Sequence, residues 1–225
     1  MKIKGAIFDM DGTIVDSLMY WSNFWNRLGE KYMNRKGFQA SEEVDKKIRT
    51  MIFADAMVYI KEYYNIPEPI EELLRFSSNG LLDFYREVAK PKAGAIELLE
   101  YLKAQNVKLC LASATAMKQV KYALECHDMA KYFDVVLSCA DIGVGKDQPD
   151  IYLLAQEKLG VPAEELCVFE DSYVALETAK KVGFQTVGIY DQYNFEQQRL
   201  EKASNIYLPK GKSLDTLIDL INTEA

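Results

Sequence analysis

The segment Ile3-Lys4-Gly5-Ala6-Ile7-Phe8-Asp9-Met10-Asp11-Gly12-Thr13 is a short apolar run that ends in two aspartates. The apolar run predicts a buried strand, and the Asp-Gly pair predicts a turn directly after it. From residue 93 onward, similar apolar runs alternate with helical patterns, which is typical of an α/β fold: a Rossmann-like parallel sheet with helices on both faces. Further strands are expected at 107–112, 134–138, 166–169, 185–189 and, more weakly, 205–208, with helices at 96–105, 117–125, 150–159, 174–182 and 213–221.

Residues 17–88 break this alternation, because they show only helical periodicity. Helices are expected at 18–28, 51–64 and 70–88, and the sequence Ser77-Ser78-Asn79-Gly80 predicts a kink or a break in the last of them. An all-helical block that starts just after the first strand lies over the carboxyl ends of the strands. We therefore predict two domains, a catalytic core (1–16 and 89–225) and an inserted helical cap (17–88).

Composition excludes several classes of protein. The formal charge of −7 argues against a surface that binds nucleic acid, and no apolar run approaches the ~20 residues that span a bilayer. The four cysteines form no CxxC pair, which is typical of reduced thiols in a cytosolic protein. We expect a cytoplasmic monomer that binds neither nucleic acid nor membranes.

His127 is the single histidine, so sites built from several histidines are excluded. It lies at the predicted end of a helix, where a solvent-facing or capping role is expected. The chemistry must then depend on carboxylates, hydroxyls and lysines.

Four polar sites follow predicted strands, at the edge where open α/β sheets bind ligands. Taken singly, each has a simpler explanation: a turn or cation-binding loop, a helix N-cap, a surface lysine, or acidic residues in the first turn of a helix. Together and in this order, they indicate one site. They are Asp9-Met10-Asp11-Gly12-Thr13, Ser113-Ala114-Thr115, Lys146 and Glu170-Asp171-Ser172.

Phosphoryl transfer requires a nucleophile, a proton donor for the leaving oxygen and positive charge around the phosphoryl oxygens. A carboxylate can attack phosphorus and form an aspartyl-phosphate. Several carboxylates would repel an anionic substrate unless a cation were present, and oxygen ligands beside a phosphate suit Mg²⁺. Lys146 would add positive charge, and Ser113 a hydroxyl donor.

The chain resembles the haloacid dehalogenase superfamily, in particular the group that contains β-phosphoglucomutase and many sugar-phosphate phosphatases. The four motifs carry this resemblance, which covers essentially the whole chain. It implies that Asp9 is the nucleophile and Asp11 the general acid/base. It also implies that Asp9, the backbone carbonyl of Asp11, and Asp171 ligate Mg²⁺, with Glu170 acting through bound water. Phosphate would be held by Ser113, the backbone of Ala114, and Lys146.

The sequence departs from the family pattern beside Lys146. Asp147-Gln148 stands where family members often have Pro and a variable residue. We expect the carboxylate of Asp147 to point outward and to weaken the field of Lys146 only slightly.

Three functions are weighed. The first is a Mg²⁺-dependent phosphatase acting on a small phosphorylated metabolite, such as a sugar phosphate or similar phosphomonoester. The second is a phosphomutase and the third a non-enzymatic phosphate-binding regulator, which the complete set of motif residues disfavours. A dehalogenase is disfavoured because those enzymes need no metal. The related mutases carry a histidine where this chain has Trp21 and a cap lysine in the region of residues 77–80, so we expect a hydrolase.

The predicted cap begins with the aromatic residues Tyr20, Trp21, Phe24 and Trp25. At helical spacing they form a broad apolar face, which predicts the core of the cap. Trp21, nearest the catalytic loop, is an alternative candidate for shaping the substrate pocket. Arg49 either contacts a second anionic group of the substrate or belongs to a solvated charge run.

Overall fold

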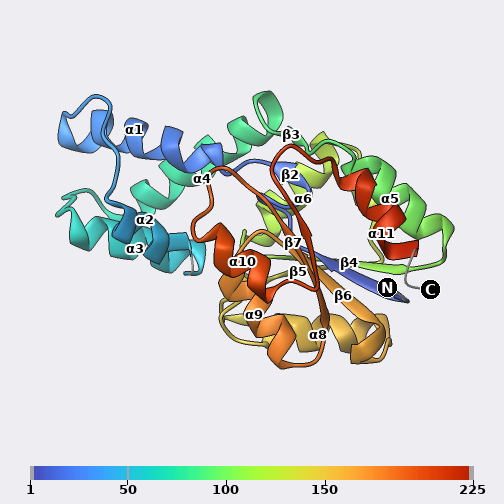
Figure 1. The fold of residues 1–225 in the computed structure, drawn as a ribbon. Coiled ribbons are helices and arrows are strands. Elements are labelled where there is room, and N and C mark those ends of the chain that lie inside the picture. Colours follow the sequence, from blue (N-terminus) through green and yellow to red (C-terminus); the bar gives the residue numbers. More distant parts are fainter. Residues whose placement is uncertain (1–2, 50, 223–225) are drawn as a thin grey trace.

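The computed structural model describes residues 3–49 and 51–222, without the side chains of Arg49 and Asn222. Its centre is a six-stranded parallel sheet with the strand order β5-β4-β1-β6-β7-β8 (Figure 1). The expected α/β fold is confirmed, including the weaker last strand. The strands are β1 (Gly5–Phe8), β4 (Lys108–Ser113), β5 (Val135–Ser138), β6 (Leu166–Glu170), β7 (Gln185–Ile189) and β8 (Ile206–Leu208).

Helices cover both faces of the sheet, because alternate strand residues point to opposite sides. Ala6 and Phe8 of β1 share one apolar cluster with α5 (Ala95–Ala104), α6 (Met117–Cys126) and α11 (Leu217–Asn222). Ile7 lies in a second cluster with α8 (Asp150–Leu159), α9 (Tyr173–Lys181) and α10 (Gln197–Ala203). Phe8 and Phe169 stack across the strand pair with ring centroids 4.3 Å apart. The central strand is therefore buried on both sides and held rigidly beneath the motif that follows it.

Four helices lie between β2 (Val15–Asp16) and β3 (Lys90–Pro91) along the chain. They are α1 (Met19–Met33), α2 (Glu42–Arg49), α3 (Phe53–Tyr63) and α4 (Ile70–Glu87), here called the helical block (Figure 1). Tyr20, Phe24 and Trp25 are buried in its interior, as the helical spacing predicted. The indole N–H of Trp25 donates to Asp45 Oδ1 at 2.8 Å. None of the described helices combines the length and apolarity needed to span a bilayer.

A two-stranded antiparallel ribbon, which was not predicted, connects the helical block to the sheet. Its strands are β2 (Val15–Asp16) and β3 (Lys90–Pro91), with Val15 opposite Pro91. Each strand has only two residues, too few for a periodic pattern. The ribbon brings the entry and exit of the helical block together beside the motif.

The expected break at residues 77–80 is wrong, because α4 is continuous through them. Ser77 is buried, and its carbonyl accepts the hydroxyl of Tyr20 at 2.8 Å. Ser78 accepts the side-chain amide of Gln119 at 2.6 Å. An added Cβ at Gly80 would lie 2.3 Å from a guanidinium nitrogen of Arg27, so glycine here permits close packing within a regular helix.

Other differences concern short elements. The sequence analysis missed α2, α10 and the four-residue helix α7 (Cys139–Ile142). The expected helix at 213–221 is a 3₁₀ turn, Leu214–Thr216, followed by α11. Two further 3₁₀ turns, Ala130–Tyr132 and Ala163–Glu165, precede β5 and β6. Short helices at loop ends depend on tertiary packing more than on local propensity.

The packing of α1 generates a stability prediction for Gly29→Ala. Alanine is the better helix former by about 1 kcal/mol. However, its Cβ would lie 2.2 Å from Cβ of Phe38 and 2.7 Å from the carbonyl oxygen of Arg35. Overpacking of this kind costs about 1–3 kcal/mol, so thermal unfolding should show a net loss of stability. Asn23→Ala, at an exposed position of the same helix, is the matched control and should be neutral or stabilising. A rise in melting temperature for Gly29→Ala would contradict this packing.

Candidate active site

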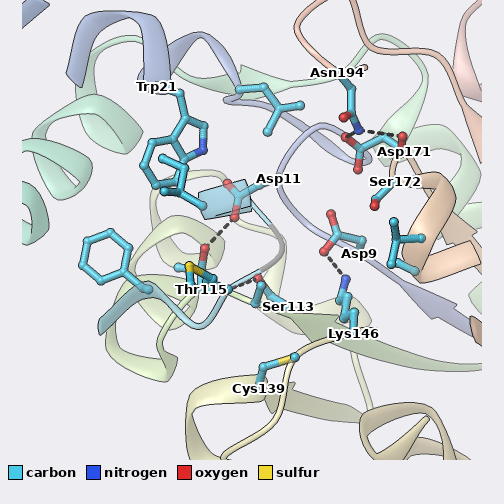
Figure 2. A pocket seen from close by; sticks show the side chains of 18 of the residues that line it. Asp9, Asp11, Trp21, Ser113, Thr115, Cys139, Lys146, Asp171, Ser172 and Asn194 are labelled. Atoms are coloured by element: carbon cyan, nitrogen blue, oxygen red, sulfur yellow. Dashed lines mark hydrogen bonds and ion pairs between the residues drawn. The ribbon is translucent and has the colours of Figure 1, made fainter. Parts of the chain in front are cut away.

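The polar motifs meet at the carboxyl edge of the sheet, around a cavity of about 210 Å³ (Figure 2). Asp9 follows β1 directly, Ser113 ends β4 and Glu170 ends β6. Because these three strands are neighbours, the three side chains at their ends lie close together. The structure thus brings together every residue for which a catalytic, phosphate-binding or metal-binding role was predicted: Asp9, Asp11, Ser113, Ala114, Lys146, Glu170 and Asp171 all line the cavity.

Lys146 joins two of the carboxylates. Its ammonium contacts Asp9 Oδ1 and lies 2.5 Å from Glu170 Oε1, and its side chain is only 10% exposed. Burial opposes the charge on this lysine, but the carboxylates of Asp9 and Glu170 outweigh burial and raise its pKa well above the usual value. Lys146 is therefore a fixed positive charge beside Asp9. The neighbouring residue Asp147 is exposed at the cavity rim.

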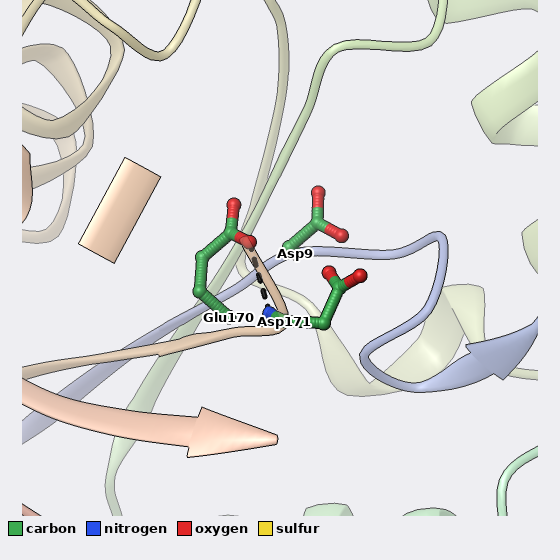
Figure 3. A group of neighbouring side chains, drawn as sticks. All are labelled: Asp9, Glu170 and Asp171. Carbon is green, nitrogen blue, oxygen red and sulfur yellow. Dashed lines mark hydrogen bonds between the residues drawn. The ribbon is translucent and has the colours of Figure 1, made fainter. Parts of the chain in front are cut away.

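Asp9, Glu170 and Asp171 form a group of acids suited to a cation (Figure 3). One carboxylate oxygen from each lies within 4.8 Å of the others. Burial raises the pKa of both Glu170 and Asp171, and the neighbouring acids raise that of Asp171 further. A bound cation would offset this repulsion, and an all-oxygen donor set is what Mg²⁺ prefers. The residues present therefore fit a divalent metal ion.

The carboxylate of Asp171 is held by neighbours on two sides. It accepts the hydroxyl of Thr13 at 3.1 Å and the side-chain amide of Asn194 at 2.8 Å. Gly12, which has a φ of +87°, passes so close that an added Cβ would lie 2.4 Å from Asp171 Oδ2. The glycine of the first motif is thus required both by its backbone conformation and by its contact with the acid. Glu170 Oε2 accepts the backbone N–H of Asp171 at 3.0 Å.

Asp11 points to the opposite side of the motif loop and accepts three hydroxyl groups. Tyr85 donates at 2.6 Å and Ser17 at 2.7 Å to Oδ1, and Thr115 donates at 2.8 Å to Oδ2. Burial and the charge of Asp9 raise the pKa of Asp11, while the three hydrogen bonds lower it in part. A raised pKa is the direction of shift that favours a proton-carrying role such as that of a general acid.

Ser113 does not cap a helix, since Ala116 is the N-cap residue of α6 and has no side-chain cap. The Ser113 hydroxyl accepts the backbone N–H of Thr115 at 3.0 Å. Ser138 in turn donates to the carbonyl of Thr115 at 2.8 Å. These contacts fix the turn that carries Ala114, and Ser113, Ala114 and Thr115 all line the cavity with Asp9.

Other candidate residues lie as follows. Trp21 lines the cavity, so its position matches the alternative interpretation and not the interior of the helical block (Figure 2). Arg49 ends α2, and its side chain lies outside the described part of the chain. His127 is the C-cap residue of α6, as its sequence position suggested. Cys139 lines the cavity, but burial raises the pKa of its thiol to about 11, so it is not a thiolate at neutral pH.

The sequence analysis did not assign a role to Ser17, Tyr85 or Asn194. Ser17 lies six residues after Asp11, close enough in the sequence to be considered as a hydrogen-bond partner of that carboxylate. Tyr85 sits near the end of an amphipathic helix, where an aromatic residue normally indicates core. Asn194 lies in the loop between β7 and α10, in a polar stretch without a motif.

Comparisons with known proteins agree with this arrangement. A family model for haloacid dehalogenase-like hydrolases matches residues 3–183. The chain is 28% identical over 220 residues to the phosphorylated carbohydrates phosphatase of Thermotoga maritima, covering 97% of this chain and 100% of that protein. It is 33% identical over 256 aligned positions to a haloacid dehalogenase-like hydrolase domain-containing protein of Arabidopsis thaliana, covering 100% of this chain and 81% of the other.

A crystal structure from Thermotoga maritima, named provisionally as a β-phosphoglucomutase, superposes with a TM-score of 0.75 at 28% identity. The superposition covers 97% of this chain and 100% of that one. The family model spans four of the six strands of the sheet (β1, β4, β5 and β6), the helical block and all four motifs. The chain therefore belongs to the haloacid dehalogenase-like hydrolase family.

Proposed function

We propose that this hydrolase is a phosphatase, which removes the phosphoryl group of a small phosphorylated metabolite through an aspartyl-phosphate on Asp9. The observation that carries the proposal is the placement of Asp9 between Lys146 and the acidic pair Glu170-Asp171, with Asp11 held two residues further along the same loop. The name of the Thermotoga maritima relative supports this class of reaction, and phosphorylated carbohydrates are one kind of substrate that it suggests.

In the first step a carboxylate oxygen of Asp9 forms a bond to phosphorus, and the bond from phosphorus to the ester oxygen breaks. Asp11 gives its proton to the leaving oxygen, so that the alcohol departs neutral. Lys146, the Ser113 hydroxyl and the backbone N–H of Ala114 stabilise the charge on the phosphoryl oxygens. The raised pKa of Asp11 supports its role as the acid.

In the second step Asp11 takes a proton from water, and the water oxygen attacks phosphorus. The bond between phosphorus and Asp9 breaks, inorganic phosphate leaves, and Asp9 is again a carboxylate. The hydrogen bonds from Tyr85, Ser17 and Thr115 hold Asp11 in one orientation for both proton transfers.

Phosphatases of this family generally use a metal ion, and we propose Mg²⁺ here. Asp9 and Asp171 would ligate it through their side chains and Asp11 through its backbone carbonyl, with Glu170 acting through water. When bound, Mg²⁺ would offset the negative charge that these carboxylates present to an anionic substrate.

The phosphomutase alternative has less support. A mutase must keep water from the phosphorylated aspartate while the substrate reorients, and the related mutases have a histidine at the position of Trp21. An indole cannot transfer the proton that an imidazole can. Residues 77–80, where those mutases carry a lysine, contribute nothing to the cavity lining. We therefore favour hydrolysis.

We further propose that residues 17–88 form a cap domain over a core of 1–16 and 89–225. The ribbon of β2 and β3 lies at both proposed boundaries and supports them. We also propose a cytoplasmic monomer that binds neither nucleic acid nor membrane; the net charge of −7 supports the absence of a nucleic-acid-binding surface.

Substitutions of the two aspartates should have different effects. Asp9→Asn removes the nucleophile and should eliminate both turnover and the covalent intermediate, measured by phosphate release and by mass spectrometry of quenched enzyme. Asp11→Asn should lower kcat by roughly 10²–10⁴-fold for alkyl phosphates, the usual contribution of general acid–base catalysis. The loss should be smaller for p-nitrophenyl phosphate, whose leaving group needs less protonation. Near-normal turnover by Asp9→Asn would refute the mechanism.

Removal of divalent metal should abolish activity, because the uncompensated carboxylates of Asp9 and Asp171 would repel a phosphate dianion. Phosphate release should be lost in EDTA and restored by excess Mg²⁺, with Ca²⁺ as the control for a cation that prefers different coordination. Full turnover in the chelator would contradict the metal assignment.

Incubation with β-glucose 1-phosphate and glucose 1,6-bisphosphate separates the hydrolase from the mutase. A hydrolase should release free phosphate in proportion to all product formed. Both free phosphate and glucose 6-phosphate are measured over time. Efficient formation of glucose 6-phosphate without stoichiometric phosphate would establish the mutase instead.

A further inference from the structure

We infer that the alcohol part of the substrate carries a flat aromatic or heteroaromatic ring, as in nucleoside 5′-monophosphates and pyridoxal 5′-phosphate. This inference rests on the proposed phosphatase function and narrows its substrate class. It concerns the wall that the helical block contributes to the cavity, across from the carboxylates of the core.

That wall is apolar, and every helix of the block contributes to it. Trp21 comes from α1, Ile48 from α2, Phe53 and Ala56 from α3, and Leu81 from α4. Met51 and Ile52 continue the surface between α2 and α3. Burial of apolar ligand surface against such a wall contributes about 25 cal/mol per Å².

Among the residues that the structure describes, the polar groups on the same wall already have partners. The hydroxyl of Tyr20 donates to the carbonyl of Ser77 at 2.8 Å, and that of Tyr85 donates to Asp11 at 2.6 Å. The ammonium of Lys46 lies 2.8 Å from Glu42 Oε1 and 5.1 Å from the centre of the Phe195 ring. A sugar hydroxyl turned toward this wall would therefore exchange water for apolar side chains, and each hydroxyl left without a partner would weaken binding.

Trp21 is placed to stack on a planar group. It lines the same cavity as Asp11 (Figure 2). Its aromatic neighbours Tyr20 and Phe24 meet it edge-on, at interplanar angles of 68° and 80°, so neither is stacked flat against it. Stacking of a base on an aromatic side chain contributes about 1–3 kcal/mol, which corresponds to roughly 5–150-fold in affinity.

Two pairs of substrates test this inference. Uridine 5′-monophosphate is compared with ribose 5-phosphate, which lacks the base, and pyridoxal 5′-phosphate with glycerol 3-phosphate, which lacks the ring. We expect kcat/KM for at least one ring-bearing ester to exceed that of its ring-free partner by tenfold or more. A ratio near one in both pairs would overturn the inference while leaving the phosphatase function intact.

Variants of Trp21 give the second readout. Trp21→Leu should reduce the preference for the ring-bearing ester about tenfold, and Trp21→Phe, which keeps a flat ring, should restore most of it. Tyr63→Ala is the control, because Tyr63 is an aromatic residue that is 53% exposed and does not line the cavity. It should leave the ratio of kcat/KM between the ring-bearing and the ring-free ester unchanged. If Trp21→Leu lowered kcat/KM equally for the ring-bearing and the ring-free substrate of a pair, a stacking role for Trp21 would be contradicted.

A binding measurement separates failure of the inference from failure of the proposed function. If no phosphomonoester were hydrolysed, p-nitrophenyl phosphate included, the phosphatase function would be wrong. Calorimetric titration of Asp9→Asn with uridine 5′-monophosphate and ribose 5-phosphate would then decide the inference. Equal affinities for the two compounds would overturn it.

Discussion

Asp9, Glu170 and Asp171 bring three carboxylates within 4.8 Å of one another in a buried site, and their mutual repulsion must be offset for the chain to fold around them. Lys146 offsets part of this repulsion by bridging two of the acids, and Thr13 and Asn194 donate hydrogen bonds to Asp171. Burial makes each of these contacts stronger and makes the loss of any one more costly. The charges of these acids and of Lys146 offset one another in part. Binding of an anionic substrate and of a cation would both change that balance.

The position of these groups follows from the sheet. Three adjacent parallel strands end at one edge, and each end carries an acid or a hydroxyl. Lys146 comes instead from the loop between α7 and α8, so its place depends on the packing of those helices. Asp11 is satisfied from three separate segments, including the helical block through Tyr85. The orientation of the proposed acid thus depends on the whole fold.

The sheet, the principal helices and the meeting of the four motifs could be predicted, because apolar runs and post-strand polar residues are local signals. The ribbon of β2 and β3 could not, since two-residue strands have no periodicity. The interpretation of residues 77–80 failed because close packing against Arg27 explains Gly80 better than a break does. Tyr85 and Asn194 were missed because only long-range contacts place them in the site. The sequence around Tyr85 suggests the apolar face of a helix, and the sequence around Asn194 suggests a loop.

The central place of β1 has a consequence for biosynthesis. Its residues Gly5–Phe8 pair with residues 108–111 on one side and 166–169 on the other. At a translation rate of about 5–20 residues per second, the first strand must wait on the order of ten seconds or more before its second neighbour has been synthesised. During that interval the backbone groups of β1 that pair with β6 have no partner strand. Asp9 would be among the first residues made and among the last to acquire its surroundings.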